Sequence, residues 1–301
     1  MTDILKLEGV VKSYEKQIAV DHVSFAMPEG CIFGLLGPNG AGKTSLIRII
    51  TTITRADAGT VYFQNEKLNG SHPAQIGYMP EERGLYKKMK VGPHLLYLAQ
   101  LKGLTHAEAK EKIGAWFEKF GISDWWNKKI EELSKGMQQK VQFIATVVHK
   151  PKLLILDEPF SGLDPVNTNL IKEEIKELSK QGASIIFSTH RMEQVEEICE
   201  HIVLINKGRN VLEGKVADIR QRFKQHLFHI GFDGQLPADF GQRVGIVKAE
   251  DNVVTVQLPS DGQHSDALLR YLLDAGVHIR SFHEILPSLN EIFIQQVGEE
   301  Q

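Results

Sequence analysis

The sequence has little of what marks several large classes of proteins. Its two cysteines, Cys31 and Cys199, are far apart and lie in apolar stretches, so we expect two buried thiols in a reducing cytosol. No apolar run approaches the roughly 18 residues that a membrane-spanning helix needs. Residues 1–9 lack the basic and then apolar pattern of a secretory signal. If the protein serves a membrane process, we therefore expect another polypeptide to supply the membrane part.

An excess of positive charge is also absent. The formal net charge is −3, which gives no reason to expect a surface that binds nucleic acid. Of the 301 residues, 42% are hydrophobic and 24% are charged, so the chain can bury a sizeable core. This length predicts one large domain, or a large domain with a small one.

Strands and helices alternate along the first two thirds of the chain. The apolar segment 31–36 predicts a buried strand that leads into a glycine-rich loop and then a helix. The later pattern predicts strands at 152–156, 183–188 and 202–205 and helices at 169–181 and 192–199. Such alternation is typical of an α/β fold, in which a mostly parallel sheet carries helices on its faces.

Two other segments interrupt or follow this α/β pattern. Apolar residues at helical spacing predict a helical insertion at about residues 85–132. Within it, Trp125 and Trp126 belong either to the core of the insertion or to an exposed anchor for a partner. After residue 214, short strands and one helix indicate a small α+β domain. We therefore expect an α/β domain at 1–214 and an accessory domain at 215–301.

A glycine-rich loop follows the strand at 31–36. The loop and the residues after it are Gly37, Pro38, Asn39, Gly40, Ala41, Gly42, Lys43, Thr44 and Ser45. Glycines let backbone N–H groups curl around phosphate oxygens, and the next helix points its positive end at the same anion. In this pattern Lys43 contacts the β- and γ-phosphates, Thr44 binds Mg²⁺ and Ser45 bonds the α- or β-phosphate. The spacing predicts a nucleoside triphosphate site rather than a glycine turn with an idle lysine.

Two adjacent carboxylates end the strand at 152–156. Asp157 emerges at the carboxyl end of this strand, where ligands bind in open α/β sheets, and it can hold Mg²⁺ through water. Its neighbour Glu158 can polarise a water molecule for attack on the γ-phosphate. The alternative is a pair of ordinary solvated charges. The glycine-rich loop in the same chain favours the catalytic interpretation.

The segment just before this strand resembles the signature of ATP-binding cassettes. Leu133-Ser134-Lys135-Gly136-Met137 stands where that family carries LSGGQ, although Lys135 and Met137 replace its usual glycine and glutamine. Alone, Ser-Lys-Gly is only a helix-start signal. The resemblance to ABC ATPase subunits covers about residues 4–214 and implies a P-loop NTPase (ABC ATPase) fold. It also implies that Ser134 and Gly136 contact the γ-phosphate of an ATP held by a second subunit.

Three further motifs match the same family. Asp164 lies in a segment that resembles the D-loop, and His190 ends a strand as the switch histidine of the family does. That resemblance implies that His190 reaches the γ-phosphate and helps to hold the attacking water. Tyr14 resembles the aromatic residue that stacks on adenine, and Val20 could add an apolar contact to the base. The alternative for Tyr14 is a plain aromatic residue at a strand end.

One position departs from the family. A glutamine usually follows a pattern like Ile-Gly-Tyr-x-Pro, senses Mg²⁺ and water, and relays this to the membrane subunit. Here Glu81 follows Ile76-Gly77-Tyr78-Met79-Pro80. Our hypothesis is that Glu81 still reaches the metal, where Mg²⁺ or a proton offsets the repulsion between neighbouring carboxylates.

The resemblance implies ATP and Mg²⁺ as cofactors and a head-to-tail pair of cassettes, which the full motif set permits as a homodimer. It implies a separate membrane permease and a position on the cytoplasmic face of the membrane. Residues 80–86, the extra C-terminal domain and the tail at 286–293 resemble single-cassette subunits of bacterial exporters of the sodium-efflux and multidrug type. The alternatives are a soluble cassette that acts on ribosomes or DNA, and a non-transport regulator. A single set of motifs, no long coiled coil and a net charge of −3 argue against the ribosome and DNA alternatives.

Overall fold

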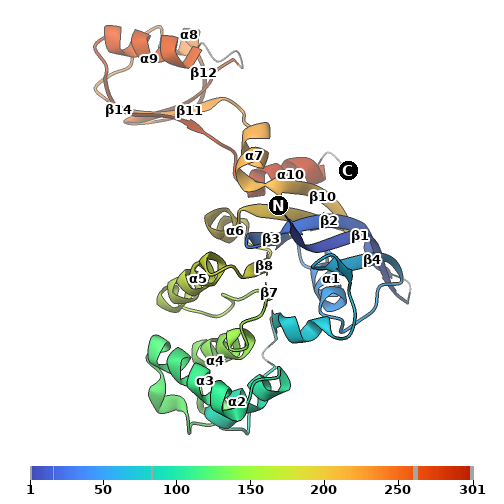
Figure 1. Ribbon diagram of the computed structural model, residues 1–301. Helices are drawn as coiled ribbons and strands as arrows, with labels where there is room; N and C mark the ends of the chain where they lie inside the picture. Colours follow the sequence, from blue (N-terminus) through green and yellow to red (C-terminus); the bar gives the residue numbers. More distant parts are fainter. Residues whose placement is uncertain (1, 16, 83, 260–263, 299–301) are drawn as a thin grey trace. The chain divides into compact units, whose positions relative to one another are not determined.

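The chain divides into two compact units in the computed structural model, which describes residues 2–15, 17–82, 84–259 and 264–298 (Figure 1). The first unit comprises residues 1–216 and the second residues 217–301. No helix among the described residues is both long and apolar enough to cross a membrane. Both cysteines are buried free thiols, as expected, and burial raises the pKa of Cys31 to about 11.

A six-stranded sheet forms the centre of the first unit. Its order is β10-β9-β3-β8-β7-β6, and every neighbouring pair is parallel except β10 with β9. The strands are β3 (Ile32–Leu36), β6 (Ile76–Met79), β7 (Leu153–Asp157), β8 (Ser184–Thr189), β9 (His201–Asn206) and β10 (Arg209–Lys215). Every residue of β3, β7 and β8 is buried, as expected for strands covered on both faces. This sheet confirms the predicted α/β fold.

One face of this sheet packs on a second, antiparallel sheet and on α1 (Lys43–Ile50). The second sheet has the order β2-β1-β4-β5, with strands β1 (Asp3–Tyr14), β2 (Gln17–Pro28), β4 (Ala58–Phe63) and β5 (Glu66–Lys67). Alternate residues of the parallel strands, such as Phe33, Leu35 and Ile186, form one core with this layer. The sequence pattern had not indicated β4, β5, β6 or β10.

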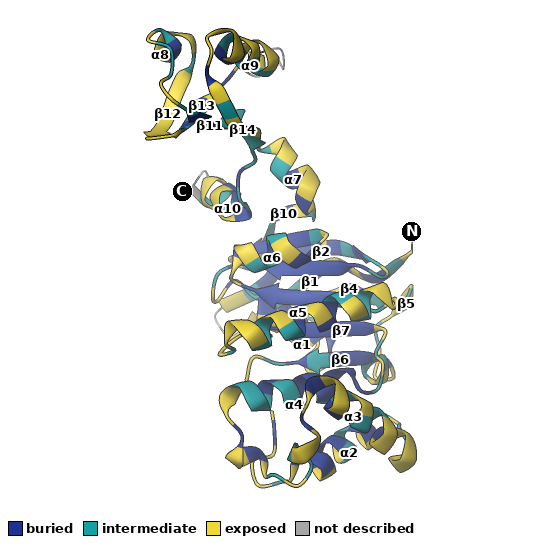
Figure 2. Ribbon diagram, turned by 90° about the vertical axis from the view of Figure 1, so that its left-hand side faces the viewer, coloured by how far each residue is buried: buried dark blue, intermediate teal, exposed yellow. Residues whose placement is uncertain are grey.

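Helices cover the other face of the parallel sheet. Figure 1 shows α6 (Met192–Ile198), α5 (Pro165–Lys180) and α4 (Lys135–Val147) along this side, and Figure 2 shows exposed residues on α5 and α6, whereas α4 is mainly buried or intermediate. Helix α5 begins four residues before the predicted start at 169. Asp164 caps it by accepting a hydrogen bond from the Asn167 N–H at 3.0 Å, and Pro165 suits the first helical position.

The predicted helical insertion consists of α2 (Val91–Leu101) and α3 (His106–Phe120), with single 3₁₀ turns at Ser123–Trp125 and Ile130–Glu132; a third such turn, His72–Gln75, precedes β6. Thr105 and Glu108 form a capping box that starts α3. The Trp126 ring lies against Phe117, with ring centroids 5.7 Å apart, and a Cβ at Gly92 would lie 2.4 Å from it. Trp126 therefore contributes to packing within the insertion, and both tryptophans are half-buried.

The second unit is a small α+β domain built on one antiparallel sheet of order β12-β13-β11-β14. Its strands are β11 (Leu227–Asp233), β12 (Gly245–Glu250), β13 (Val253–Gln257) and β14 (His278–Ile285), and its helices are α8 (Phe240–Arg243), α9 (His264–Asp274) and α10 (Leu289–Gly298); α7 (Val216–Arg222) spans the boundary between the units. Ile230, Val254 and Leu272 are central to its core. Helix α10 was not predicted, although Ser288 and Glu291 form the S-x-x-E start signal of a helix.

A buried histidine in α2 gives this fold a dependence on pH. His94 is fully buried, and neither ring nitrogen has a hydrogen-bond partner among the described residues. Burial lowers the pKa of His94 to about 4. The unfolded chain binds a proton near pH 6.5 and the folded chain does not until about pH 4. Stability is therefore lost as the pH falls from about 6.5 to 4, by at most about 1.4 kcal/mol per pH unit from this group.

We expect His94→Phe to flatten the pH dependence of the free energy of unfolding between pH 6.5 and 4. The variant should also be about 1 kcal/mol more stable at pH 7, because it removes a buried polar group without partners. Urea denaturation at a series of pH values measures both effects. His106→Phe, at the exposed start of α3, is the matched control. An unchanged pH slope in His94→Phe would show that His94 is not the group responsible.

Candidate functional site

The glycine-rich loop lies between the carboxyl end of β3 and the first turn of α1. Gly37 and Gly42 have φ angles of +150° and +109°, and a Cβ there would lie 2.1 Å from the Ile205 carbonyl oxygen and 2.2 Å from that of Ala19, respectively. Only glycine fits both places. The loop is thus held between β9 and β2, and its N–H groups continue into the N-terminus of α1, an arrangement suited to phosphate binding.

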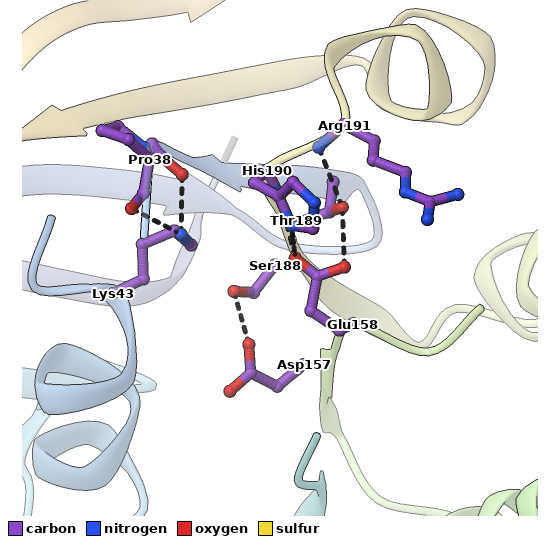
Figure 3. Close-up of polar contacts among 9 residues, drawn as sticks. Pro38, Lys43, Asp157, Glu158, Ser188, Thr189, His190 and Arg191 are labelled. Atoms are coloured by element: carbon purple, nitrogen blue, oxygen red, sulfur yellow. Dashed lines mark hydrogen bonds and ion pairs between the residues drawn. The ribbon is translucent and has the colours of Figure 1, made fainter. Parts of the chain in front are cut away.

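Lys43 is the first residue of α1, and its side chain folds back onto the loop. Its Nζ donates hydrogen bonds to the carbonyl oxygens of Gly37 at 2.7 Å and Pro38 at 3.1 Å (Figure 3). Burial lowers the pKa of Lys43, while the charges of Glu158, Asp157 and Glu81 act in the opposite direction. The ammonium group is therefore close enough to three carboxylates to interact with them.

Asp157 ends β7 and is almost completely buried. Its Oδ1 accepts a hydrogen bond from the Ser188 hydroxyl at 2.7 Å, because the two residues are register partners on β7 and β8. Burial raises the pKa of Asp157, and the Ser188 hydrogen bond acts against this rise. A buried carboxylate with one oxygen engaged in this way is well placed to receive a cation.

Glu158 follows in the left-handed backbone region, with a φ of 48°. Its Oε1 accepts a hydrogen bond from the His190 backbone N–H at 2.9 Å and contacts His190 Nδ1 at 2.7 Å. Its Oε2 accepts a hydrogen bond from the Thr189 hydroxyl at 3.1 Å. Figure 3 shows Asp157 and Glu158 at the carboxyl end of β7, beside Ser188, Thr189 and His190 at the carboxyl end of β8. The backbone strain at Glu158 is typical of functional positions, and it accompanies a carboxylate held by three groups.

A cavity of about 320 Å³ joins these groups. Its lining residues are Ala19, Asn39, Gly40, Ala41, Gly42, Lys43, Thr44, Ser45, Glu81, Asp157 and Glu158. The structure thus brings the glycine-rich loop, both carboxylates and Glu81 to one place. Gly37 and Pro38 support the loop from behind by accepting the hydrogen bonds of Lys43.

Two predicted base contacts do not line this cavity. Val20 is buried in the core beneath the loop, and its neighbour Ala19 faces the cavity instead. Successive side chains of a strand point to opposite faces, which explains the difference between the two residues; the contact of Val20 with the base stays a prediction. Tyr14 lies at the end of β1 and is 41% exposed, with the Lys12 ammonium 5.5 Å from its ring centroid.

The signature residues lie at the start of α4, outside the cavity. Ser134 is the N-cap, and its hydroxyl accepts a hydrogen bond from the Met137 N–H at 3.3 Å. Ser134 and Lys135 are exposed, whereas Gly136 and Met137 are half-buried. A Cβ at Gly136 would lie 3.6 Å from Leu163, just before Asp164, the exposed cap of α5. The N-terminus of α4 is therefore exposed and does not line the cavity of its own chain.

Comparison with known proteins places the chain in a family. The chain is 44% identical over 295 residues to the uncharacterized ABC transporter ATP-binding protein YhaQ of Bacillus subtilis, a match that covers 98% of this chain and 99% of the relative. The chain belongs to the ABC transporter ATP-binding proteins. The family described as "ABC transporter" matches residues 20–161, and the family "ATP-binding protein DrrA1-3-like, C-terminal domain" matches residues 214–297.

Other ABC transporter proteins are similar over about three quarters of the chain. The Nod factor export ATP-binding protein I of Ralstonia nicotianae is 34% identical over 221 residues, which are 72% of this chain and 69% of that protein. A solved structure of an ATP-binding subunit of an ABC transporter superposes with a TM-score of 0.68 at 30% identity and covers 73% of this chain and 93% of its own. These likenesses confirm the ABC ATPase fold.

The cassette contains functional candidates that the sequence pattern did not indicate. Ser188 and Thr189 hold Asp157 and Glu158, and the Gln142 side chain donates to the Pro80 carbonyl oxygen at 2.8 Å, next to Glu81. Ser188 and Thr189 end the strand beside β7, and the rule that sites form at carboxyl strand ends could have identified them. Gln142 lies within α4, and no local pattern signals its contact.

The residues of the cassette fit the Mg²⁺ that this family implies. Thr44, Asp157 and Glu81 place hydroxyl and carboxylate oxygens, the ligands that Mg²⁺ prefers, around the cavity. Among residues 2–15, 17–82, 84–259 and 264–298, no three His, Cys, Asp or Glu side chains are grouped to hold a metal alone. This agrees with a site in which phosphate oxygens and water complete the coordination.

Proposed function

We propose that this protein is the ATP-hydrolysing subunit of an ABC exporter, which binds Mg²⁺·ATP and drives a separate membrane permease. The observation that carries this proposal is the cavity that gathers Lys43, Asp157 and Glu158 beside the glycine-rich loop and the N-terminus of α1. Membership of the ABC transporter ATP-binding proteins supports it. The reaction is the hydrolysis of ATP to ADP and phosphate.

The contacts suggest how each residue acts. Lys43 exchanges its bonds to the Gly37 and Pro38 carbonyl oxygens for phosphate oxygens, and Ser45 and the loop N–H groups bind the same anion. Thr44, Asp157 and Glu81 would hold Mg²⁺, which neutralises phosphate charge when bound. Glu158 accepts the proton of the attacking water, and Thr189 and His190 orient its carboxylate.

We further propose a head-to-tail dimer, in which the signature residues of one copy complete the site of the other. In the single chain Ser134 and Lys135 are exposed and do not line the cavity, so both are accessible to a second copy. A second copy would supply Ser134, Lys135, Gly136 and Met137 together with the N-terminus of α4, and its Asp164 would lie beside them. Tyr14 would stack on the adenine.

We propose that the helical insertion contacts the permease. Tyr86, Tyr97 and Leu101 are 54%, 44% and 66% exposed, and the two tyrosine rings lie 6.2 Å apart. Exposed aromatic and aliphatic side chains of this kind favour a protein partner. The similarity to the Nod factor export ATP-binding protein supports export, and the cytoplasmic face of the membrane is the proposed location. The permease would select the cargo. A membrane protein that co-purifies with this chain would identify the permease.

We expect Glu158→Gln to lower the turnover of ATP by about 10²- to 10⁴-fold, because the amide cannot accept the water proton. Binding of ATP should persist, since Lys43 and the loop are intact, and the ATP-bound dimer should accumulate. Phosphate release and size-exclusion chromatography with ATP measure the two effects. Glu193→Gln, an exposed position on α6, is the control. Normal turnover in Glu158→Gln would rule out Glu158 as the base.

We expect activity to return when Ser134→Arg is mixed with Glu158→Gln. Each variant alone should be inactive, because both of its sites carry the defect. A mixed dimer has one site with an intact Glu158 from one copy and an intact Ser134 from the other. Turnover should recover to roughly a quarter of the wild-type value, the statistical share of such sites. No recovery, with both variants folded and able to bind ATP, would contradict the head-to-tail arrangement.

We expect Glu81→Ala to raise the Mg²⁺ concentration that half-saturates ATP hydrolysis by about tenfold, since it removes an oxygen ligand from the cavity. Glu81→Gln keeps one oxygen and should show a smaller rise. Glu82→Ala changes the neighbouring exposed carboxylate, which does not line the cavity, and is the matched control. Unchanged Mg²⁺ dependence in both Glu81 variants would refute a metal role for Glu81.

A further inference from the structure

The first unit has a second, larger cavity, of about 540 Å³. It lies between α3, the connection from α4 to β7 and the C-terminal end of α5. Figure 1 shows α5, α4 and α3 in succession along this side of the unit. A volume of this size is within the range of small-molecule sites, roughly 300–1,000 Å³.

This cavity is separate from the nucleotide cavity. Leu154 is the second residue of β7, and Ala183 directly precedes β8, so both mark the amino ends of these strands. Asp157 and Thr189 end the same two strands at their carboxyl ends. Because β7 and β8 are parallel, the two cavities lie at opposite edges of the sheet, and they share no lining residue.

The inner wall of the cavity is apolar and firmly packed. Val147, Val148 and Leu154 are at most 2% exposed, and Leu178 closes the side toward α5. The Trp116 ring lines the cavity and packs edge-on against Phe143, with ring centroids 5.9 Å apart. This wall can bind an apolar group without rearrangement, because its side chains are already fixed by the core.

The rim of the cavity is basic. Four lysines, Lys112, Lys119, Lys150 and Lys152, line it, against a single acid, Glu111. Lys119 is paired with Glu174 on α5, and Lys152 donates to the Gln64 side chain at 3.0 Å.

Lys112 and Lys150 form no ion pair with any residue that the structure describes. The positive charge of the lysines also affects the neighbouring His149. Its pKa is lowered to about 4, first by burial and then by the charges of Lys102 and Lys112.

We propose that this cavity binds an amphiphilic anion, with an apolar chain on the Trp116 wall and a carboxylate at the Lys112 and Lys150 rim. A fatty-acid-like molecule fits both features, because its chain gains free energy from burial and its head is a single charge. Lysines are flexible point charges and suit such a head group. The ligand would contact α3 of the helical insertion and α5 of the central layer at once, across the junction that the Lys119–Glu174 pair already joins.

Titration calorimetry of the full chain with laurate, below its micelle concentration, tests this proposal. We expect saturable one-site binding that persists with Mg²⁺·ATP present. The double variant Lys112→Glu/Lys150→Glu should weaken the binding at least tenfold. The matched control Lys110→Glu/Lys180→Glu changes α3 and the end of α5 at positions outside the cavity. Its laurate affinity should stay within twofold of the wild-type value. Dodecyltrimethylammonium should not bind.

A second variant separates a lost site from a misfolded protein. Ala115→Trp places a large side chain from the exposed surface of α3 into the cavity and should abolish laurate binding while circular dichroism and the melting temperature stay unchanged. The proposal is overturned if laurate does not bind the wild type, or if the cationic detergent or dodecanol binds equally well. Equal laurate affinity in the double variant and its control, or in Ala115→Trp, also overturns it.

Discussion

The parallel pairing of β7 with β8 is the constraint on which the site depends. Its register sets Asp157 opposite Ser188, and the next residues, Glu158, Thr189 and His190, then meet at the carboxyl edge of the sheet. A shift of one residue would turn Asp157 into the core and leave Glu158 without its partners. The pairing is stable because every residue of both strands is buried between the α1 layer and the helices α4 to α6.

Much of this arrangement follows from the sequence because it is local. A glycine loop between an apolar strand and a helix has one common use, and Asp157 follows four apolar residues that form a buried strand. The sequence pattern did not predict helix starts that depend on side-chain capping. The start of α5 depends on Asp164 and Pro165, and the start of α10 depends on Ser288 with Glu291. Both capping signals are present in the sequence, but hydrophobic periodicity does not indicate them.

Contacts between distant segments could not be predicted in this way. Nothing local requires that Glu158 accept a hydrogen bond from residue 190, or that Ala19 rather than Val20 face the nucleotide cavity. The orientation of Ala19 and Val20 depends on the register of β2 against β1, which has several irregularities. A single bulge reverses the face of every later side chain. The second cavity likewise requires α3, α5 and the α4–β7 connection to be placed together before its lysines become a rim.

The two cavities use the same sheet in opposite ways. At its carboxyl edge, strand ends converge with the N-terminus of α1, so backbone N–H groups and carboxylates surround a compact site suited to a highly charged phosphate and Mg²⁺. At its amino edge the inner wall of the cavity is instead apolar, and lysines line the rim. That edge suits a large apolar body with one charge. Because Asp164 caps the start of α5 and Leu178 near its end lines the second cavity, one helix links the predicted dimer contact to the proposed ligand.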